Sequence, residues 1–211
     1  FDFAFSVLIL LLQIFLLRVV WTSVYADQAS FEGSGGVGVI DLQTQIAYAT
    51  IATLQFWLFV SPFANQLAQR VYQGRIATDL VRPVGLLQQA ISSQVGITAA
   101  LAPFALLALP FAIVVGGARM PPTIEALAGY VVSTACAYGI TVLLSTLVGM
   151  MAFWTVEITG PSMIYRLVAQ VLSGALVPLW FMPDWLRSIA GLLPFQSTTY
   201  TPVAIYLGKI H

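Results

Sequence analysis

One polar segment between two apolar stretches carries the residue types best suited to binding a protein partner. It spans residues 65–80 and reads NQLAQRVYQGRIATDL, with the cations Arg70 and Arg75 followed by the anion Asp79. At helical spacing its apolar residues share one side, and Gly74 interrupts the helix. The apolar residues are Leu67, Val71, Ile76 and Leu80. The pattern predicts a polar surface helix, held either by a soluble partner or by lipid headgroups alone.

A second amphipathic segment, PDWLRSIAGLLPF at residues 183–195, follows the last long apolar stretch. Ten helical residues rise about 15 Å, which is half of the roughly 30 Å hydrocarbon core of a bilayer. We therefore expect a helix between Pro183 and Pro194 that dips into one leaflet or lies along it. Its polar face would hold Asp184, Arg187, Ser188 and Gly191, and its apolar face Trp185, Ile189, Leu192 and Leu193.

The sequence offers no residue set for catalysis or metal binding. It contains no Gly-x-x-x-x-Gly-Lys-Ser/Thr phosphate loop, so any ATP would have to be hydrolysed by a partner. Cys136 is the single cysteine, which excludes an intrachain disulfide. His211 is the single histidine, which argues against a His-based metal cluster and a Ser/His/Asp triad. The GSGGVG run at residues 33–38 matches a dinucleotide-binding pattern, but no strand is predicted before it. We interpret that run as a flexible loop.

These segments belong to a strongly apolar chain. Of its 211 residues, 59% are apolar and 8% charged, against about 45–50% and about 25% in soluble domains. Eight Lys and Arg balance eight Asp and Glu, and the mean hydropathy is +0.92. These values exclude a water-soluble protein, a disordered chain and a nucleic-acid binder.

Five stretches reach the roughly 20 apolar residues that a helix needs to cross a bilayer. They are continuously apolar instead of alternating, which disfavours a transmembrane barrel. We therefore predict an all-α polytopic membrane protein with a single transmembrane domain over residues 1–211. The expected spans are about residues 3–24, 42–61, 86–115, 124–154 and 163–181.

The distribution of Lys and Arg sets the predicted orientation, because short cytoplasmic loops are enriched in these residues. Residues 62–85 contain Arg70, Arg75 and Arg82, whereas residues 25–41 contain no Lys or Arg. We therefore place residues 62–85 in the cytoplasm and residues 25–41 on the outer side.

Small side chains recur every four residues along the fourth expected span. Such a ridge lets another helix approach closely, either within the subunit or between two copies. Its members are Gly129, Ser133, Ala137, Thr141, Ser145 and Gly149.

Polar side chains inside the expected spans allow two interpretations. Arg18 could line a translocation path, or it could reach the outer headgroups or pair within the bundle. The side chains that could hydrogen-bond cargo are Gln13, Gln55, Gln94 and Gln170, although bonding between helices is the commoner use of such residues.

Two separate tracts resemble the permease subunits of type-2 ABC exporters. The first is RVYQGRIATDLVRPVGLL at residues 70–87, and the second is LSGALVPLWFMPDWLRSIAGLLPF from residue 172, followed by YTPVAIYLG. The matching positions of the first are Gly74, Ile76, Leu80, Arg82 and Pro83. Those of the second are Ser173, Gly174, Pro178, Leu179, Pro183, Trp185, Leu186, Leu193, Pro194 and Phe195, with Pro202 and Gly208 beyond.

The resemblance implies an ABC exporter transmembrane domain of the six-span type, multi-pass in the plasma (inner) membrane of a prokaryote. The sixth span is expected beyond residue 211. A coupling segment at about residues 65–83 would contact two copies of an ABC ATPase subunit, which bind ATP and Mg. A second permease, identical or homologous, would complete the pathway. Coupling residues would be Arg70, Gln73, Gly74, Arg75, Asp79, Arg82 and Pro83, and those of an external gate Pro178, Pro183, Asp184, Trp185, Arg187, Pro194 and Phe195.

The few charges within the spans favour an amphiphilic or apolar cargo, such as a drug or a lipid. One rival is a secondary transporter driven by an ion gradient, which needs titratable residues at mid-membrane. Apart from Arg18, none is evident. The other rival is a membrane scaffold without transport activity, and copurification of an ATPase subunit would separate it from a transporter.

Overall fold

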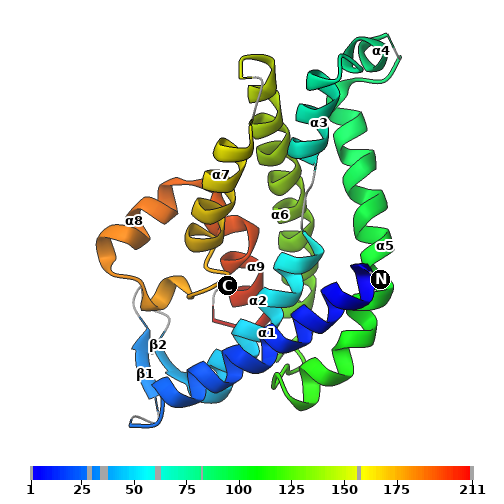
Figure 1. The fold of residues 1–211 in the computed structure, drawn as a ribbon. Coiled ribbons are helices and arrows are strands. Elements are labelled where there is room, and N and C mark those ends of the chain that lie inside the picture. Colours follow the sequence, from blue (N-terminus) through cyan, green and yellow to red (C-terminus); the bar gives the residue numbers. More distant parts are fainter. Residues whose placement is uncertain are drawn as a thin grey trace.

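The structure is a computed structural model, and it describes residues 2–27, 30–33, 38–59, 63–81, 83–155 and 158–209. Over these residues the chain is mainly helical, as the composition predicts, with one two-stranded hairpin (Figure 1). Arg82 lies outside the described residues. The elements are α1 (Asp2–Val24), β1 (Ser30–Gly33), β2 (Gly38–Asp41), α2 (Leu42–Leu58), α3 (Phe63–Tyr72), α4 (Ile76–Leu80), α5 (Leu86–Val114), α6 (Ile124–Met150), η1 (Met151–Phe153), α7 (Thr159–Leu172), η2 (Leu179–Phe181), α8 (Asp184–Leu192), η3 (Pro194–Thr198) and α9 (Tyr200–Tyr206).

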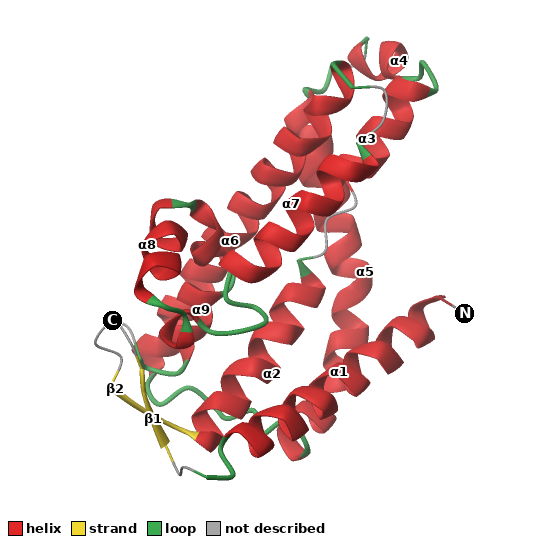
Figure 2. Ribbon diagram, turned by 60° about the vertical axis from the view of Figure 1, so that its left-hand side comes forward, coloured by secondary structure: helices red, strands yellow, loops and turns green. Residues whose placement is uncertain are grey.

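The short helix α4 and the β1–β2 hairpin lie at opposite ends of the bundle. In Figure 1, α4 is at the top, beyond the ends of α3 and α5, and the two strands are at the bottom. Helix α1 runs obliquely past α2 and α5 (Figure 2). The two segments that the charge distribution places on opposite sides of a membrane are therefore at opposite ends of the molecule.

Within the described part of the chain, four stretches are long and apolar enough to cross a membrane, judged by length and composition. They are Phe5–Val24, α2 taken together with α3 (Leu42–Tyr72), Leu86–Val114 and Ile124–Phe153. They cover the first four predicted spans. Many of their apolar side chains face outward, for example Leu107 at 73% exposure and Leu147 at 64%. An apolar exterior of this kind is suited to lipid, where the helix satisfies its own backbone groups.

The structure corrects the fifth predicted span, which was expected to be continuous over residues 163–181. Helix α7 begins at Thr159 and ends at Leu172, and its 14 residues rise only about 21 Å. Gly174, with φ +75°, takes the left-handed conformation that ends a helix. The chain then continues through η2 into α8 without resuming α7.

Helix α2 lies at the centre of the packing. Tyr48, Ile51 and Ala52 join the cluster formed with η2, α8 and α9, whereas Leu54 packs with α1 and α5. Tyr48 and Ala52 are both 0% exposed. Because one helix contacts both the N-terminal and C-terminal parts, it fixes their relative positions.

The described ends of the GSGGVG run are in strands, so the prediction of a loop throughout that run is wrong at Gly33 and Gly38. Strands β1 and β2 pair in antiparallel register, with Ser30 opposite Asp41 and Gly33 opposite Gly38. A Cβ on Gly33 would lie 3.1 Å from the carbonyl oxygen of Gly38 and 3.2 Å from Cγ1 of Ile40, so the glycine permits the close approach of the two strands.

Candidate functional site

The clearest candidate site is the elbow, by which we mean residues 63–81, comprising α3, the turn at residues 73–75 and α4. Gly74 has φ +71°, a conformation available to glycine at little cost, and it reverses the chain between the two helices. The apolar side of α3 anchors the elbow, because buried Phe63 and Leu67 pack with Ala90 of α5 and Val142 of α6. The polar turn therefore follows a helix, α3, that packs firmly against the two long helices α5 and α6.

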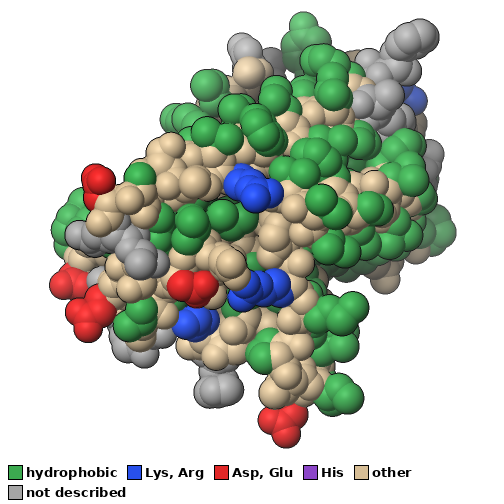
Figure 3. Space-filling model, turned by 90° about the horizontal axis from the view of Figure 1, so that it is seen from below, with side chains coloured by type: hydrophobic (Ala, Val, Ile, Leu, Met, Phe, Trp, Pro, Cys, Tyr) green, Lys and Arg blue, Asp and Glu red, His purple; other side chains and the backbone are tan. Residues whose placement is uncertain are grey.

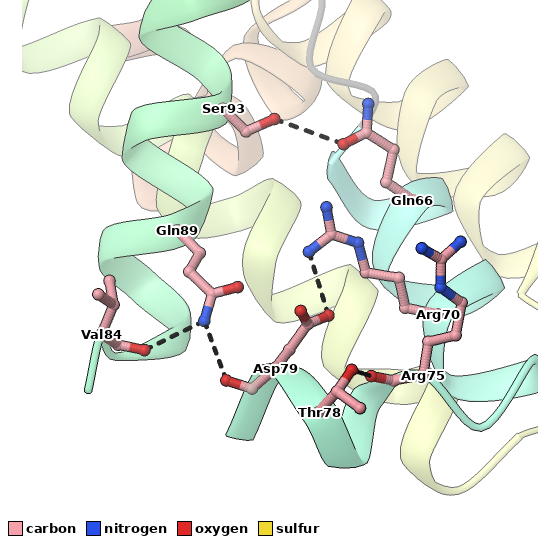
Figure 4. A network of polar contacts seen from close by, with 8 residues as sticks. All are labelled: Gln66, Arg70, Arg75, Thr78, Asp79, Val84, Gln89 and Ser93. Carbon is pink, nitrogen blue, oxygen red and sulfur yellow. Dashed lines mark hydrogen bonds and ion pairs between the residues drawn. The ribbon is translucent and has the colours of Figure 1, made fainter. Parts of the chain in front are cut away.

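A polar network joins the two arms of the elbow to α5 (Figure 4). Arg70 on α3 and Asp79 on α4 form an ion pair of 3.3 Å, although Asp79 is only 7% exposed. Gln89 of α5 donates from Nε2 to the backbone oxygen of Asp79 at 3.4 Å. Deeper along the same helices, the Ser93 hydroxyl donates to Gln66 Oε1 at 3.4 Å. These bonds hold α4 in one orientation relative to α3 and α5.

The outer surface of the elbow is exposed and polar. Gln73, Gly74 and Arg75 are all exposed, as is Pro83 at the start of the connection to α5. Thr78 donates its hydroxyl to the backbone oxygen of Arg75 at 2.7 Å, which secures the turn. The structure thus brings together the described members of the predicted coupling set, with Arg70 and Asp79 facing each other and Gln73 and Arg75 facing outward.

The predicted external gate divides into a buried part and an exposed part. In the buried part, Pro178 is less than 2% exposed, as is the nearby Trp180, which was not in the predicted set. Trp180 donates from Nε1 to Gln45 Oε1 at 3.1 Å, and Tyr48 donates to the carbonyl oxygen of Gly174 at 2.9 Å. Two side chains of α2 therefore hold the segment between α7 and α8.

The exposed part of the predicted gate lies around α8. Pro183 precedes the helix, and Asp184 in its first turn pairs with Arg187 at 2.7 Å. Trp185 is 65% exposed and presents an apolar ring to the surroundings. Pro194 is exposed, while Phe195 is partly buried with its ring 6.1 Å from that of Tyr165. The predicted short helix after Pro183 is thus present, with exposed apolar side chains.

The ridge of small residues on α6 packs inside this chain. A Cβ on Gly129 would lie 2.9 Å from Cγ2 of Ile205 in α9, and one on Gly149 would lie 3.0 Å from Cα of Ala64 in α3. All six ridge positions are buried or partly buried. The ridge brings α9 and α3 close to opposite ends of α6.

The structure places Gln13 and Arg18 on an exposed side of α1. Arg18 donates from its guanidinium to the backbone oxygen of Val115 at the end of α5, where a cation complements the helix dipole. Gln55 likewise bonds between elements, donating to the backbone oxygen of Thr198 at 2.9 Å. These contacts favour packing over a pathway role for Arg18 and Gln55.

The polar contacts of Gln45 and Tyr48 on α2 are a feature that the sequence interpretation missed. Gln45, Tyr48 and Gln55 are buried and all bond to the C-terminal part of the chain. Polar side chains within an apolar span are costly unless paired, so their presence in a predicted span was the available signal. Their partners lie more than a hundred residues away and could not be identified from the spacing.

The hairpin end carries charges of both signs among apolar side chains, as Figure 3 shows from below. Burial raises the pKa of Tyr25 to about 12, with the nearby carboxylate of Asp41 adding to the shift. The Tyr25 hydroxyl donates to the backbone oxygen of Ile40 at 3.3 Å. For Asp41, burial opposes ionisation, but hydrogen bonds from Thr44 outweigh it and lower the pKa of the carboxyl.

Comparison with known proteins gives one match. A protein-family model described as ABC-2 family transporter protein matches residues 7–211. No curated protein and no solved structure matches the chain.

Proposed function

The chain belongs to the ABC-2 family of transporter proteins, and from that premise we propose that it is the permease subunit of an ATP-driven exporter. ATP and Mg would be bound by two copies of a separate ATPase subunit. A second permease, identical or homologous, would form the other half of the translocation pathway. The protein would be multi-pass in the plasma membrane of a prokaryote, with the elbow in the cytoplasm and the hairpin outside.

The observation that carries this proposal is the elbow itself. Its turn presents Gln73 and Arg75 outward at one end of the bundle, while Arg70 and Asp79 brace the turn from within. An exposed basic turn suits a carboxylate-bearing or amide-bearing surface on an ATPase partner. The opposite, hairpin end has no comparable helical projection in the described part of the chain (Figure 1).

The packing suggests how force would travel from the ATPase. When two ATPase subunits close on ATP, they would push the elbow, and α3 would move with it because Phe63 and Leu67 fix α3 to α5 and α6. Gly149 lets α3 approach α6 closely, so a shift of α3 would be passed to α6. Rigid elements in close contact move together in this way, tilting helices to open a path.

At the other end, η2 and α8 would act as the external gate. Trp185 at 65% exposure and Leu192 at 87% suit contact with the lipid of the outer leaflet. Buried Pro178 and Trp180 tie this element to α2, so a tilt of α2 would move the gate. The cargo would be amphiphilic or apolar, because the spans hold few charges.

Copurification followed by an activity assay tests the proposal. The chain should bring down a subunit with a Walker phosphate loop, and the complex should hydrolyse ATP in nanodiscs. Arg75→Ala should lower ATPase activity, whereas Arg119→Ala, an exposed arginine distant from the elbow in sequence, should not. A complex that lacks an ATPase subunit, or equal activities for all three proteins, would refute the proposed coupling role.

A further inference from the structure

Two cavities meet at one arginine of α7. The first, of about 660 Å³, lies between α3 and α7 and is lined by residues that include Asn65, Gln69 and Ser162. The second, of about 210 Å³, lies among α2, α6, α7 and η3. Arg166 lines both. Arg166, an exposed residue, is therefore shared by an open groove beside the elbow and a smaller cavity deeper in the bundle.

The linings differ in a way that suits the two ends of an amphiphile. Phe56, Phe59, Tyr165 and Phe195 contribute four aromatic rings to the deeper cavity. The outer groove combines the apolar residues Ala68, Ile158 and Met163 with the side-chain amides of Asn65 and Gln69, a group that the described lining of the deeper cavity lacks. Among the described residues that line either cavity, Arg166 alone is charged, so no described carboxylate in the lining offsets its positive charge.

The size of the deeper cavity limits what it can hold. Pockets for whole drug-sized ligands are about 300–1,000 Å³, and this one is about 210 Å³. It can therefore accept the ring system of a ligand but not the entire molecule. The rest of such a ligand would lie in the larger groove on the other side of Arg166.

We propose that Arg166 binds the anionic head of an amphiphilic cargo whose aromatic or apolar body lies in the deeper cavity. This inference rests on the proposed export function and narrows its cargo class from amphiphiles in general to organic anions. A planar guanidinium donates paired hydrogen bonds to a carboxylate, sulfonate or phosphate, which gives both strength and orientation. The alternative is an arginine that only anchors α7 at lipid headgroups, and such an anchor would give no charge selectivity.

Two fluorescent probes with one ring system test the proposal. Anilinonaphthalene sulfonate carries an anionic group, and N-phenylnaphthylamine lacks it. The full chain is placed in phosphatidylcholine nanodiscs without nucleotide, and probe fluorescence is measured above that of empty nanodiscs. Arg166→Gln should weaken sulfonate binding about ten-fold and leave the neutral probe within about two-fold. Arg166→Lys should retain only part of the sulfonate binding, because an ammonium keeps the charge but cannot donate the paired bonds. Arg119→Gln serves as the control at an exposed arginine outside both cavities.

Three results would overturn the proposal. The first is that Arg166→Gln leaves both affinities unchanged, and the second is that it weakens the binding of both probes equally. The third is that the Arg166-dependent difference vanishes when the nanodiscs contain phosphatidylglycerol. The last result would mean that Arg166 binds the headgroups of anionic bilayer lipid and not a cargo. None of them would affect copurification of an ATPase subunit or the loss of ATPase activity in Arg75→Ala, so a failure here is distinct from a failure of the proposed function.

Discussion

The guanidinium of Arg70 lies 3.3 Å from a carboxylate oxygen of Asp79, across the turn formed at Gly74. Arg70 is on α3, which is anchored by buried side chains, and Asp79 is on α4, a helix of only five residues. A helix this short is not stable by itself. Its orientation therefore depends on the ion pair, the turn and the bond from Gln89.

A double-mutant cycle should show that this ion pair couples the two arms. Replacing Arg70 and Asp79 by Ala, singly and together, should give a coupling energy of about 0.5–1 kcal/mol, because the carboxylate is largely shielded from water. The control is the Arg187–Asp184 pair, whose Asp184 side chain is 85% exposed and whose coupling should be smaller. Thermal unfolding and hydrogen exchange over residues 76–80 provide the measurements. A coupling no larger than that of the control pair would contradict this prediction.

Gly74→Ala should distort the elbow without affecting the bundle. A non-glycine residue in the left-handed region costs about 1–2 kcal/mol, and Gly74 has φ +71° with no atom within 4 Å of an added Cβ. Faster hydrogen exchange at residues 73–80 and lower ATPase activity are expected. Gly74→Asn should restore much of both, since Asn tolerates this conformation. Gly96→Ala is the matched control, because Gly96 is also open but lies in α5 without a positive φ.

Tyr48→Phe should lower the unfolding midpoint by removing a buried hydrogen bond. The bond from the Tyr48 hydroxyl to the carbonyl oxygen of Gly174 is 2.9 Å long and contributes about 1 kcal/mol to stability. Tyr72→Phe, at a ring that is 75% exposed, should have little effect. Equal midpoints for the two variants would show that α2 does not hold the end of α7 in this way.

Two glycines of α6 should respond oppositely to substitution by alanine. At Gly149 a Cβ would lie 3.0 Å from Cα of Ala64, a backbone atom that cannot move alone, so Gly149→Ala should destabilise the protein. At Gly139 nothing lies within 4 Å, and Gly139→Ala should stabilise α6 by about 0.5–1 kcal/mol. The measurement is the free energy of unfolding of both variants in the same detergent. If Gly139→Ala lost stability and Gly149→Ala did not, the packed face of α6 would be the one that carries Gly139, and this prediction would be wrong.

Stability measured at alkaline pH should show that Tyr25 is buried. Its pKa is raised to about 12 in the folded protein, while an unfolded tyrosine ionises near pH 10. Folding is therefore favoured by the neutral phenol below about pH 10, and this contribution is lost as the pH rises toward 12. Tyr25→Phe should remove that part of the alkaline loss of stability. Spectroscopic titration of Tyr25 near pH 10 would refute the prediction.

Local signals in the sequence located the elbow and α8 well. Gly74 interrupts an amphipathic pattern, and the structure breaks the helix at residues 73–75. Pro183 followed by Asp184 predicts a helix start, which is where α8 begins. In both places neighbouring residues decide the backbone, so sequence alone was enough.

The features that the sequence could not predict depend on contacts between residues that are far apart in the chain. Residues 163–181 are mostly apolar, so a count of span length gave no sign that α7 ends at Leu172. The break is stabilised by Tyr48, which is 126 residues away from Gly174. The hairpin was missed for a similar reason, because glycine-rich strands carry little β-propensity and their packing against Trp180 is not visible in the sequence.

Site-specific photocrosslinking tests the central claim, that the elbow is the contact for an ATPase subunit. A photoreactive amino acid is placed at Arg75 or at Trp185, both exposed and in different parts of the fold. The crosslinker at position 75 should capture the copurified ATPase subunit, and the one at position 185 should not. Capture from position 185 alone, or from neither position in a complex that hydrolyses ATP, would contradict the account.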